Sequence, residues 1–198
     1  MSLAASRNAI VQVCRRLYRA GLIAGQDGNV SVRLSGDRIL VTPAGMSKVD
    51  VQATDLVVLS LDGRTAKGKH KPSSEVAVHL EIYAGRPDVM AVVHAHPPTA
   101  TGFAVAGETL PANVLPELEY TVGPVALVPF EPPGTLALAR RFQSYLSGHD
   151  AWLMANHGAV TAGPSLTVAH QRMESLEHAA RILLAARAVG KIVPYPHA

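Results

Sequence analysis

The sequence lacks the features that would place the protein outside the cytoplasm or in a membrane. It has one cysteine, Cys14, among 198 residues, which excludes an intramolecular disulfide and favours a reducing compartment. No stretch reaches the ~18 apolar residues of a membrane-spanning helix, and the N-terminus shows no basic segment followed by an apolar one. We therefore expect a cytoplasmic protein without a membrane partner, in which Cys14 is a small buried apolar residue.

The chain also has only a small excess of positive over negative charge. The net charge is +3 with neutral histidines, and the lysines and arginines are scattered. The only basic cluster, residues 67–71, is short and interrupted by a glycine. Such a cluster is typical of a solvated loop, so we expect no nucleic-acid partner. A basic loop beside an anionic substrate is the alternative interpretation.

Apolar residues are plentiful and suffice for a core. They make up 48% of the chain, and there is no low-complexity tract, internal repeat or linker. We expect a single domain over residues 1–198, of which 191–198 form a tail. The apolar spacing predicts helices over residues 3–20, about 72–83, 98–106, 135–146 and 164–190. It predicts strands over residues 30–34, 39–42, 56–61, 89–96, 125–128 and 151–155. Strands that occur both in hairpins and between helices predict a mixed sheet flanked by helices.

Two histidines follow the apolar run that begins at Val89. In a strand, His94 and His96 would share one face, which is half of a tetrahedral metal site. His157, between an apolar strand and Gly158, is the best third ligand, and Glu75 stands in the expected first turn of the helix that leads to the pair. A catalytic zinc site takes three protein ligands and keeps one position open. The alternative is that each histidine is a hydrogen-bonded structural residue. We expect the structural role for the remaining histidines, His70, His79, His149, His170, His178 and His197.

Three polar turns indicate an anion pocket. Consecutive backbone amides in glycine turns form concavities that bind anions, and a helix N-terminus adds free amides. Each turn alone is more typical of an ordinary turn or cap, but three together favour phosphate. The candidate residues are Gly28, Asn29, Ala44, Gly45, Ser73 and Ser74.

Six segments in this order resemble the class II aldolase/adducin head family, most closely its L-fuculose-phosphate aldolase type. The resemblance extends from about residue 3 to residue 190. The segments are 27–33, 39–45, 72–75, 93–96, 132–135 and 156–158. The resemblance implies a three-layer α/β/α sandwich with a central, largely antiparallel mixed sheet. It also implies a homotetramer with active sites at subunit interfaces.

The resemblance assigns roles to the candidate residues. It implies a Zn²⁺ ion, with Mn²⁺ or Co²⁺ as other possible metals, on His94, His96 and His157. Glu75 matches the acidic residue that ligates the empty metal and acts as the acid/base once substrate displaces it. The six turn residues match the phosphate pocket. The implied reaction is reversible cleavage of a ketose 1-phosphate, such as L-fuculose 1-phosphate, to dihydroxyacetone phosphate and an aldehyde through a metal-stabilised enediolate.

The chain departs from the family pattern in two places. It has Ala44 where these phosphate loops usually carry a hydroxyl, and Asp27 where Ser or Thr is common; a carboxylate beside a phosphate is unfavourable unless it points away. The aldolases also use a tyrosine supplied across the interface. Here Glu117 and Tyr120 are the candidates for that catalytic role, with Glu119 and Tyr195 as further possibilities.

These departures keep other functions open. The same metal site could serve pentulose-phosphate epimerisation, or dehydration or decarboxylation of a non-sugar hydroxy or keto acid. A non-catalytic binding module, as in adducin heads, is disfavoured because such modules lack the metal histidines. Cupins also use a His-x-His pair, but their glutamate follows the pair, whereas Glu75 precedes it.

Overall fold

A computed structural model describes residues 2–196; His197 and Ala198, in the expected tail, lie outside the described residues. Within these described residues, one sheet of eight strands runs through the molecule in the order β4-β3-β2-β1-β5-β8-β7-β6. All neighbouring strands pair antiparallel except β6 and β7. The strands are β1 Asn29–Leu34, β2 Arg38–Val41, β3 Val57–Ser60, β4 Ala66–Lys67, β5 Ala91–Ala95, β6 Val125–Val128, β7 Ala151–Met154 and β8 Gly158–Gly163. The helices are α1 Leu3–Arg19, α2 Val76–Gly85, α3 Pro98–Val105, α4 Pro116–Thr121, α5 Leu136–Phe142 and α6 Leu166–Val189, with a short 3₁₀ turn at Gln143–Tyr145.

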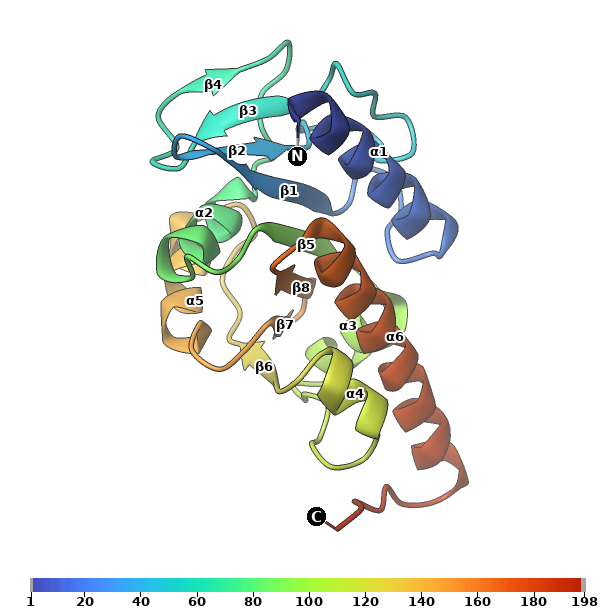
Figure 1. The fold of residues 1–198 in the computed structure, drawn as a ribbon. Coiled ribbons are helices and arrows are strands. Elements are labelled where there is room, and N and C mark those ends of the chain that lie inside the picture. The colour runs from blue at the N-terminus through green and yellow to red at the C-terminus, as the bar shows by residue number, and fades with distance from the viewer. Residues whose placement is uncertain (1, 197–198) are drawn as a thin grey trace.

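Helices cover both faces of the sheet. Figure 1 shows α1, α3 and α6 on one side and α2 and α5 on the other, with α4 beside α6. This arrangement confirms the three-layer α/β/α sandwich with a largely antiparallel mixed sheet. Alternate residues of each strand therefore point into different cores.

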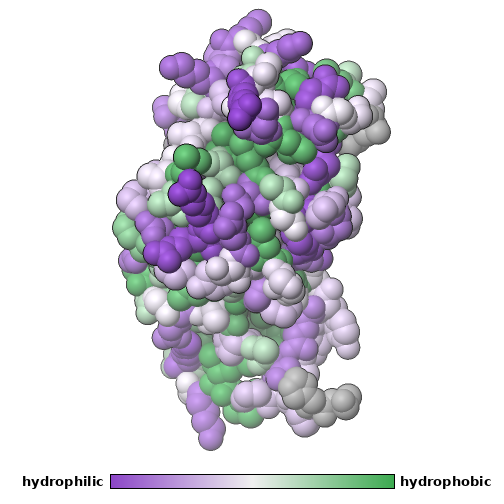
Figure 2. Space-filling model, turned by 90° about the vertical axis from the view of Figure 1, so that its left-hand side faces the viewer, coloured by the Kyte–Doolittle hydropathy of each residue, from purple (hydrophilic) through white to green (hydrophobic). Residues whose placement is uncertain are grey.

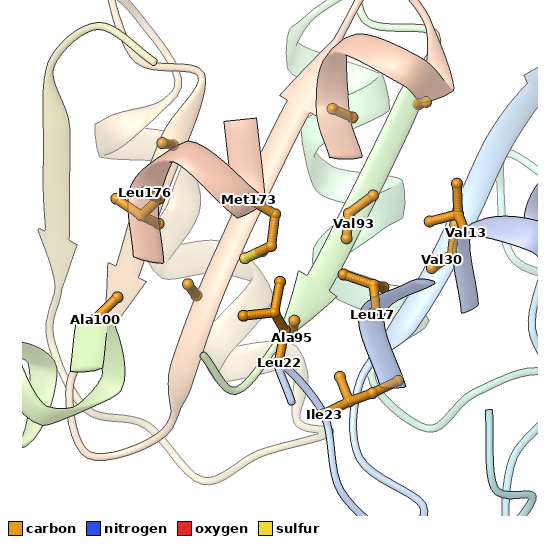
Figure 3. Close-up of a cluster of buried hydrophobic side chains, with 14 of the residues drawn as sticks. Val13, Leu17, Leu22, Ile23, Val30, Val93, Ala95, Ala100, Met173 and Leu176 are labelled. Atoms are coloured by element: carbon orange, nitrogen blue, oxygen red, sulfur yellow. The ribbon is translucent and has the colours of Figure 1, made fainter. Parts of the chain in front are cut away.

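The larger core lies under α1 and α6. Figure 3 shows Val13 and Leu17 of α1 near Val30 of β1 and Val93 of β5, and Met173 of α6 lies over the same sheet face. These side chains are buried. Full burial of each such side chain contributes roughly 1.5–3 kcal/mol to folding, so this face fixes the position of β5. The smaller core, under α2 and α5, contains Trp152 and Phe142.

The structure corrects three details of the predicted elements. Helix α2 begins at Val76, so Glu75 is its N-cap residue instead of lying in the first turn, and no side chain caps this helix. Strand β8, the edge strand β4 and helix α4 were absent from the prediction. The helix expected to run to about residue 146 is α5, which ends at Phe142.

On the face shown in Figure 2, hydrophobic groups form patches among hydrophilic side chains.

Among the described residues, no helix is long and apolar enough to cross a membrane.

A buried carboxylate anchors α3, the helix that follows His96. Glu177 of α6 is 2% exposed and accepts hydrogen bonds from the backbone N–H groups of Thr99, at 3.0 and 3.2 Å, and Ala100, at 2.9 Å. It also pairs with Arg181 at 2.7 Å. These bonds satisfy helix N-terminal donors that have no partner within the helix itself.

We expect Glu177→Leu to lower the free energy of unfolding by ~2–4 kcal/mol, because one buried and one partly buried N–H group lose a charged acceptor. Urea denaturation followed by circular dichroism measures the loss. Arg181→Gln is the matched control and should cost under ~1 kcal/mol, since that side chain is 57% exposed. Equal effects of the two variants would contradict the capping role.

Candidate metal centre and anion pocket

The end of strand β5, the turn between β7 and β8 and the start of α2 meet at one edge of the sheet. His94 lies near the end of β5, His96 follows that strand, and His157 lies in the turn between β7 and β8. Strand β5 pairs with β8 so that Ala95 faces Ala159, which brings this turn alongside the two histidines. Glu75 precedes α2. The predicted ligand set is thus brought together from three separate parts of the chain.

The three imidazole rings form a compact cluster. Their centroids are 4.9, 4.9 and 5.0 Å apart, and one ligand atom from each ring lies within 4.8 Å of the others. The Nε2 atoms of His94 and His96 are 3.2 Å apart. Glu75 places one carboxylate oxygen 3.1 Å from His94 Nε2 and the other 3.0 Å from His157 Nε2.

The outer nitrogens of two rings have partners that orient the inner ones. His94 Nδ1 donates to the carbonyl of Ala159 at 2.9 Å, which turns its Nε2 toward the cluster. His96 Nδ1 lies 3.4 Å from a carboxylate oxygen of Asp27. Burial, followed by the neighbouring His94 and His157, lowers the pKa of His96 to about 4. His96 is therefore neutral near pH 7, the form in which imidazole binds a metal.

Glu75 is ionised and held in place. Burial opposes ionisation, but hydrogen bonds with His157 and His94 outweigh it and keep the pKa of Glu75 well below its ordinary value. Asn29 Nδ2 donates to Glu75 Oε2 at 3.1 Å. Asn29 is 2% exposed and lies opposite His94 in the β1–β5 register, so one strand pair orients both the His94 ring and the Glu75 carboxylate.

Two glycines permit the close approach of these segments. A Cβ on Gly158 would lie 2.6 Å from His96 Cδ2 and 2.7 Å from the carbonyl oxygen of Ala95. A Cβ on Gly28 would lie 2.7 Å from the carbonyl oxygen of His94, and the residue has a φ of +72°. Any larger residue at either position would displace the histidine strand.

The donor set fits a divalent transition metal. Three neutral imidazoles are the ligand set of catalytic zinc sites, and the Glu75 carboxylate is where a fourth ligand would lie. Imidazole also suits Cu, Fe and Ni, so the geometry does not fix the metal's identity.

The six residues predicted to form an anion pocket do line one pocket, next to the histidine cluster. They are Gly28, Asn29, Ala44, Gly45, Ser73 and Ser74. The pocket has a volume of about 380 Å³ and also reaches Glu75, His96 and His157. The turns are joined by backbone hydrogen bonds: Ala44 N donates to Lys71 O at 3.0 Å and Ser73 N donates to Thr42 O at 3.1 Å. Lys48, which the sequence analysis did not single out, lines the pocket too. No local pattern distinguishes it from a surface lysine.

Asp27 lines the same pocket but directs one oxygen toward His96. A carboxylate that accepts a hydrogen bond from the outer nitrogen of a ligating histidine fixes its ring and raises its basicity. The unfavourable contact anticipated between Asp27 and an anion is reduced by this orientation. Asp27 is therefore placed to orient the His96 ring, a candidate metal ligand.

We expect Asp27→Ala to weaken zinc binding about tenfold, the low end for such partners because the side chain is 45% exposed. Competition with a chromophoric chelator measures the dissociation constant. Asp50→Ala, which removes one negative charge from an exposed position on a nearby loop, is the control and should leave zinc affinity unchanged. An unaltered affinity in the Asp27 variant would rule out this support.

The proposed interface residues lie elsewhere on their own chain. Among the described residues, those that line the pocket do not include Glu117 or Tyr120. Both belong to α4; Glu117 lines a groove against α6 and Tyr120 is 91% exposed. In the tail, Tyr195 N donates to Asn113 O at 2.7 Å, and a hydrogen bond with Glu119 raises the pKa of Tyr195 to about 12. A catalytic role for Glu117 or Tyr120 thus stays a prediction that requires a second subunit.

Comparison with known proteins assigns the family. The family model described as Class II Aldolase and Adducin N-terminal domain matches residues 8–184. An L-fuculose phosphate aldolase of Methanococcus maripaludis is 36% identical over 172 residues, covering 87% of this chain and 92% of that protein. A 3-oxo-tetronate 4-phosphate decarboxylase of Haemophilus influenzae is 34% identical over 182 residues, covering 90% of this chain and 86% of that protein.

A solved structure of an L-fuculose 1-phosphate aldolase superposes with a TM-score of 0.91 at 30% identity, covering 97% of this chain and 91% of that one. The relatives carry out more than one reaction, so the likeness defines the family more closely than the substrate. The chain belongs to the class II aldolase and adducin N-terminal domain family.

Proposed function

We propose that this protein is a zinc-dependent class II aldolase that cleaves a ketose 1-phosphate reversibly to dihydroxyacetone phosphate and an aldehyde. The observation that carries the proposal is one pocket lined by His96, His157 and Glu75 together with the three anion-binding turns. A binding module would need neither a three-histidine cluster nor a carboxylate in contact with it. An L-fuculose 1-phosphate-like sugar is the substrate class that we favour, by analogy with the relatives.

Different residues of the chain bind the phosphate and act at the reacting carbon. The turns at Gly28, Gly45 and Ser73 hold the phosphate, which converts binding energy into orientation of the reacting carbon. Glu75, ionised and held by Asn29, moves the proton at the carbon of the dihydroxyacetone phosphate fragment. A zinc ion on His94, His96 and His157 would supply a Lewis acid that stabilises negative charge at the carbonyl oxygen.

A second candidate is decarboxylation, dehydration or epimerisation at the same site. One observation favours it: Ala44, which lines the pocket, supplies no hydroxyl. The similarity to a 3-oxo-tetronate 4-phosphate decarboxylase points in the same direction. The glutamate and the histidines would keep their roles in proton transfer and metal binding.

We also propose a cytoplasmic homotetramer, in which Glu117 or Tyr120 of a neighbouring subunit completes the site. The 91% exposure of Tyr120 on its own chain supports this arrangement. Light scattering on the purified protein measures the oligomeric state, and a monomer that turns over substrate at full rate would contradict it.

The function is tested with purified, zinc-loaded protein. Sugar 1-phosphates are screened for aldehyde release by a coupled dehydrogenase, and 3-oxo acid phosphates and pentulose phosphates are screened by mass spectrometry. Aldehyde release that stops with chelator and returns with zinc supports the aldolase. Loss of carbon dioxide or water, or an epimer as product, instead supports the second candidate.

A further inference from the structure

Lys48 is a buried lysine beside the anion pocket. It lies on the loop between β2 and β3 and is 2% exposed, although lysine is almost never fully buried unless its charge is paired. It lines the pocket together with Gly45 and Asp27. A residue that costs free energy to bury and that faces a ligand pocket calls for a specific role.

The ammonium of Lys48 joins two of the anion-binding turns. Its Nζ donates to the carbonyl of Gln26 at 2.7 Å and to the carbonyl of Met46 at 2.9 Å. Gln26 precedes the Gly28 turn, and Met46 follows the Ala44-Gly45 turn. One cation therefore fixes the spacing of two loops that come from different parts of the sequence.

Positive charge is scarce among the side chains that line the pocket. Among the described residues that line it, Lys48 is the only lysine or arginine, whereas Asp27 and Glu75 contribute two carboxylates. A phosphate dianion would bring further negative charge to the same space. Burial lowers the pKa of Lys48, while Cys14, Asp27 and Glu75 act in the opposite direction. A buried cation is screened by salt much less than a surface lysine.

We propose that Lys48 is the positioning residue that makes this pocket select a phosphorylated substrate. It holds the Gly28 and Gly45 turns at a fixed separation and supplies the positive charge that offsets the Asp27 carboxylate. This inference rests on the proposed function only in taking a phosphate ester as the pocket's ligand. It accounts for phosphate binding where Ala44 offers no hydroxyl.

The test compares two ligands that differ only in the phosphate. Calorimetry on zinc-loaded protein gives the affinities of dihydroxyacetone phosphate and dihydroxyacetone for the wild type and for Lys48→Met, Lys48→Gln and Lys48→Arg. Lys67→Met removes the same charge from the exposed strand β4 and serves as the control. Zinc content and thermal unfolding are measured for every variant.

We expect Lys48→Met to weaken dihydroxyacetone phosphate about 10- to 100-fold, the range for loss of a charged hydrogen-bonding partner. Dihydroxyacetone and zinc affinities should stay within a few-fold of wild type. Lys48→Arg should retain most of the phosphate selectivity, and Lys67→Met all of it. Where the methionine variant is unfolded, Lys48→Gln, which keeps a donor but loses the charge, should show the same selective loss.

An unchanged ratio of the two affinities in the folded Lys48→Met or Lys48→Gln variant would overturn the inference. Equal losses for both ligands, or loss of zinc, would overturn it too, because they indicate a purely structural lysine. The binding measurement needs no turnover. A wild type that selects dihydroxyacetone phosphate through Lys48 but releases no aldehyde would therefore refute the proposed reaction and leave the role of Lys48 intact.

Discussion

Replacing Glu75 with glutamine is expected to lower kcat by ~10²–10⁴-fold while the protein still binds zinc. This range is the usual contribution of a positioned acid or base. Glutamine has nearly the same shape and can still accept the hydrogen bond that Asn29 donates, so the pocket is preserved. It cannot take up the proton that the reaction moves. Steady-state kinetics on the identified substrate and zinc content by plasma mass spectrometry measure the two quantities.

Glu81→Gln provides the matched control, because it makes the same change on α2, away from the residues that line the pocket. Its kcat should equal that of the wild type. Wild-type turnover in the Glu75→Gln protein would refute the acid/base role. A loss of zinc in that variant would instead assign Glu75 to metal binding.

Apolar runs and alternating apolar residues were sufficient to predict the strands with large side chains. Strand β6 runs from Val125 to Val128, as the apolar pattern indicated. Strand β8 has the sequence Gly-Ala-Val-Thr-Ala-Gly, in which small residues and two glycines give little strand propensity. It forms because both of its edges pair, with β5 and with β7. Helix α4 has six residues and buries only Leu118, too little for a periodic signal.

The sequence indicated which residues meet at the candidate site, but not the directions of their side chains. The His94/His96 spacing, the apolar strand before His157 and the glycine turns are local patterns, and the family resemblance joined them into one site. Which atom Asp27 faces, and that Lys48 reaches two carbonyls, depend on how loops distant in sequence fold against each other. The capping carboxylate of Glu177 acts over 77 residues and has no local signature.

The second large effect is expected from replacing His96, which follows strand β5. His96→Ala should leave the purified protein without stoichiometric zinc and without measurable turnover. Removing one of three imidazole ligands leaves two, fewer than a catalytic zinc site requires. The loss of zinc affinity should exceed the ~10–100-fold loss caused by removing a residue that only hydrogen-bonds to a ligand. It should therefore exceed the loss in Asp27→Ala. Zinc titration with a chromophoric chelator measures both variants on one scale.

His178→Ala, an exposed histidine on α6, is the control and should keep both zinc and activity. The fold should survive His96→Ala, because the ring lies beyond the end of β5 and the apolar residues of both cores are untouched. Circular dichroism therefore separates loss of metal from loss of structure. Zinc bound as tightly as in the wild type, in a folded His96→Ala protein, would exclude the three-histidine centre and move the metal site elsewhere in the chain.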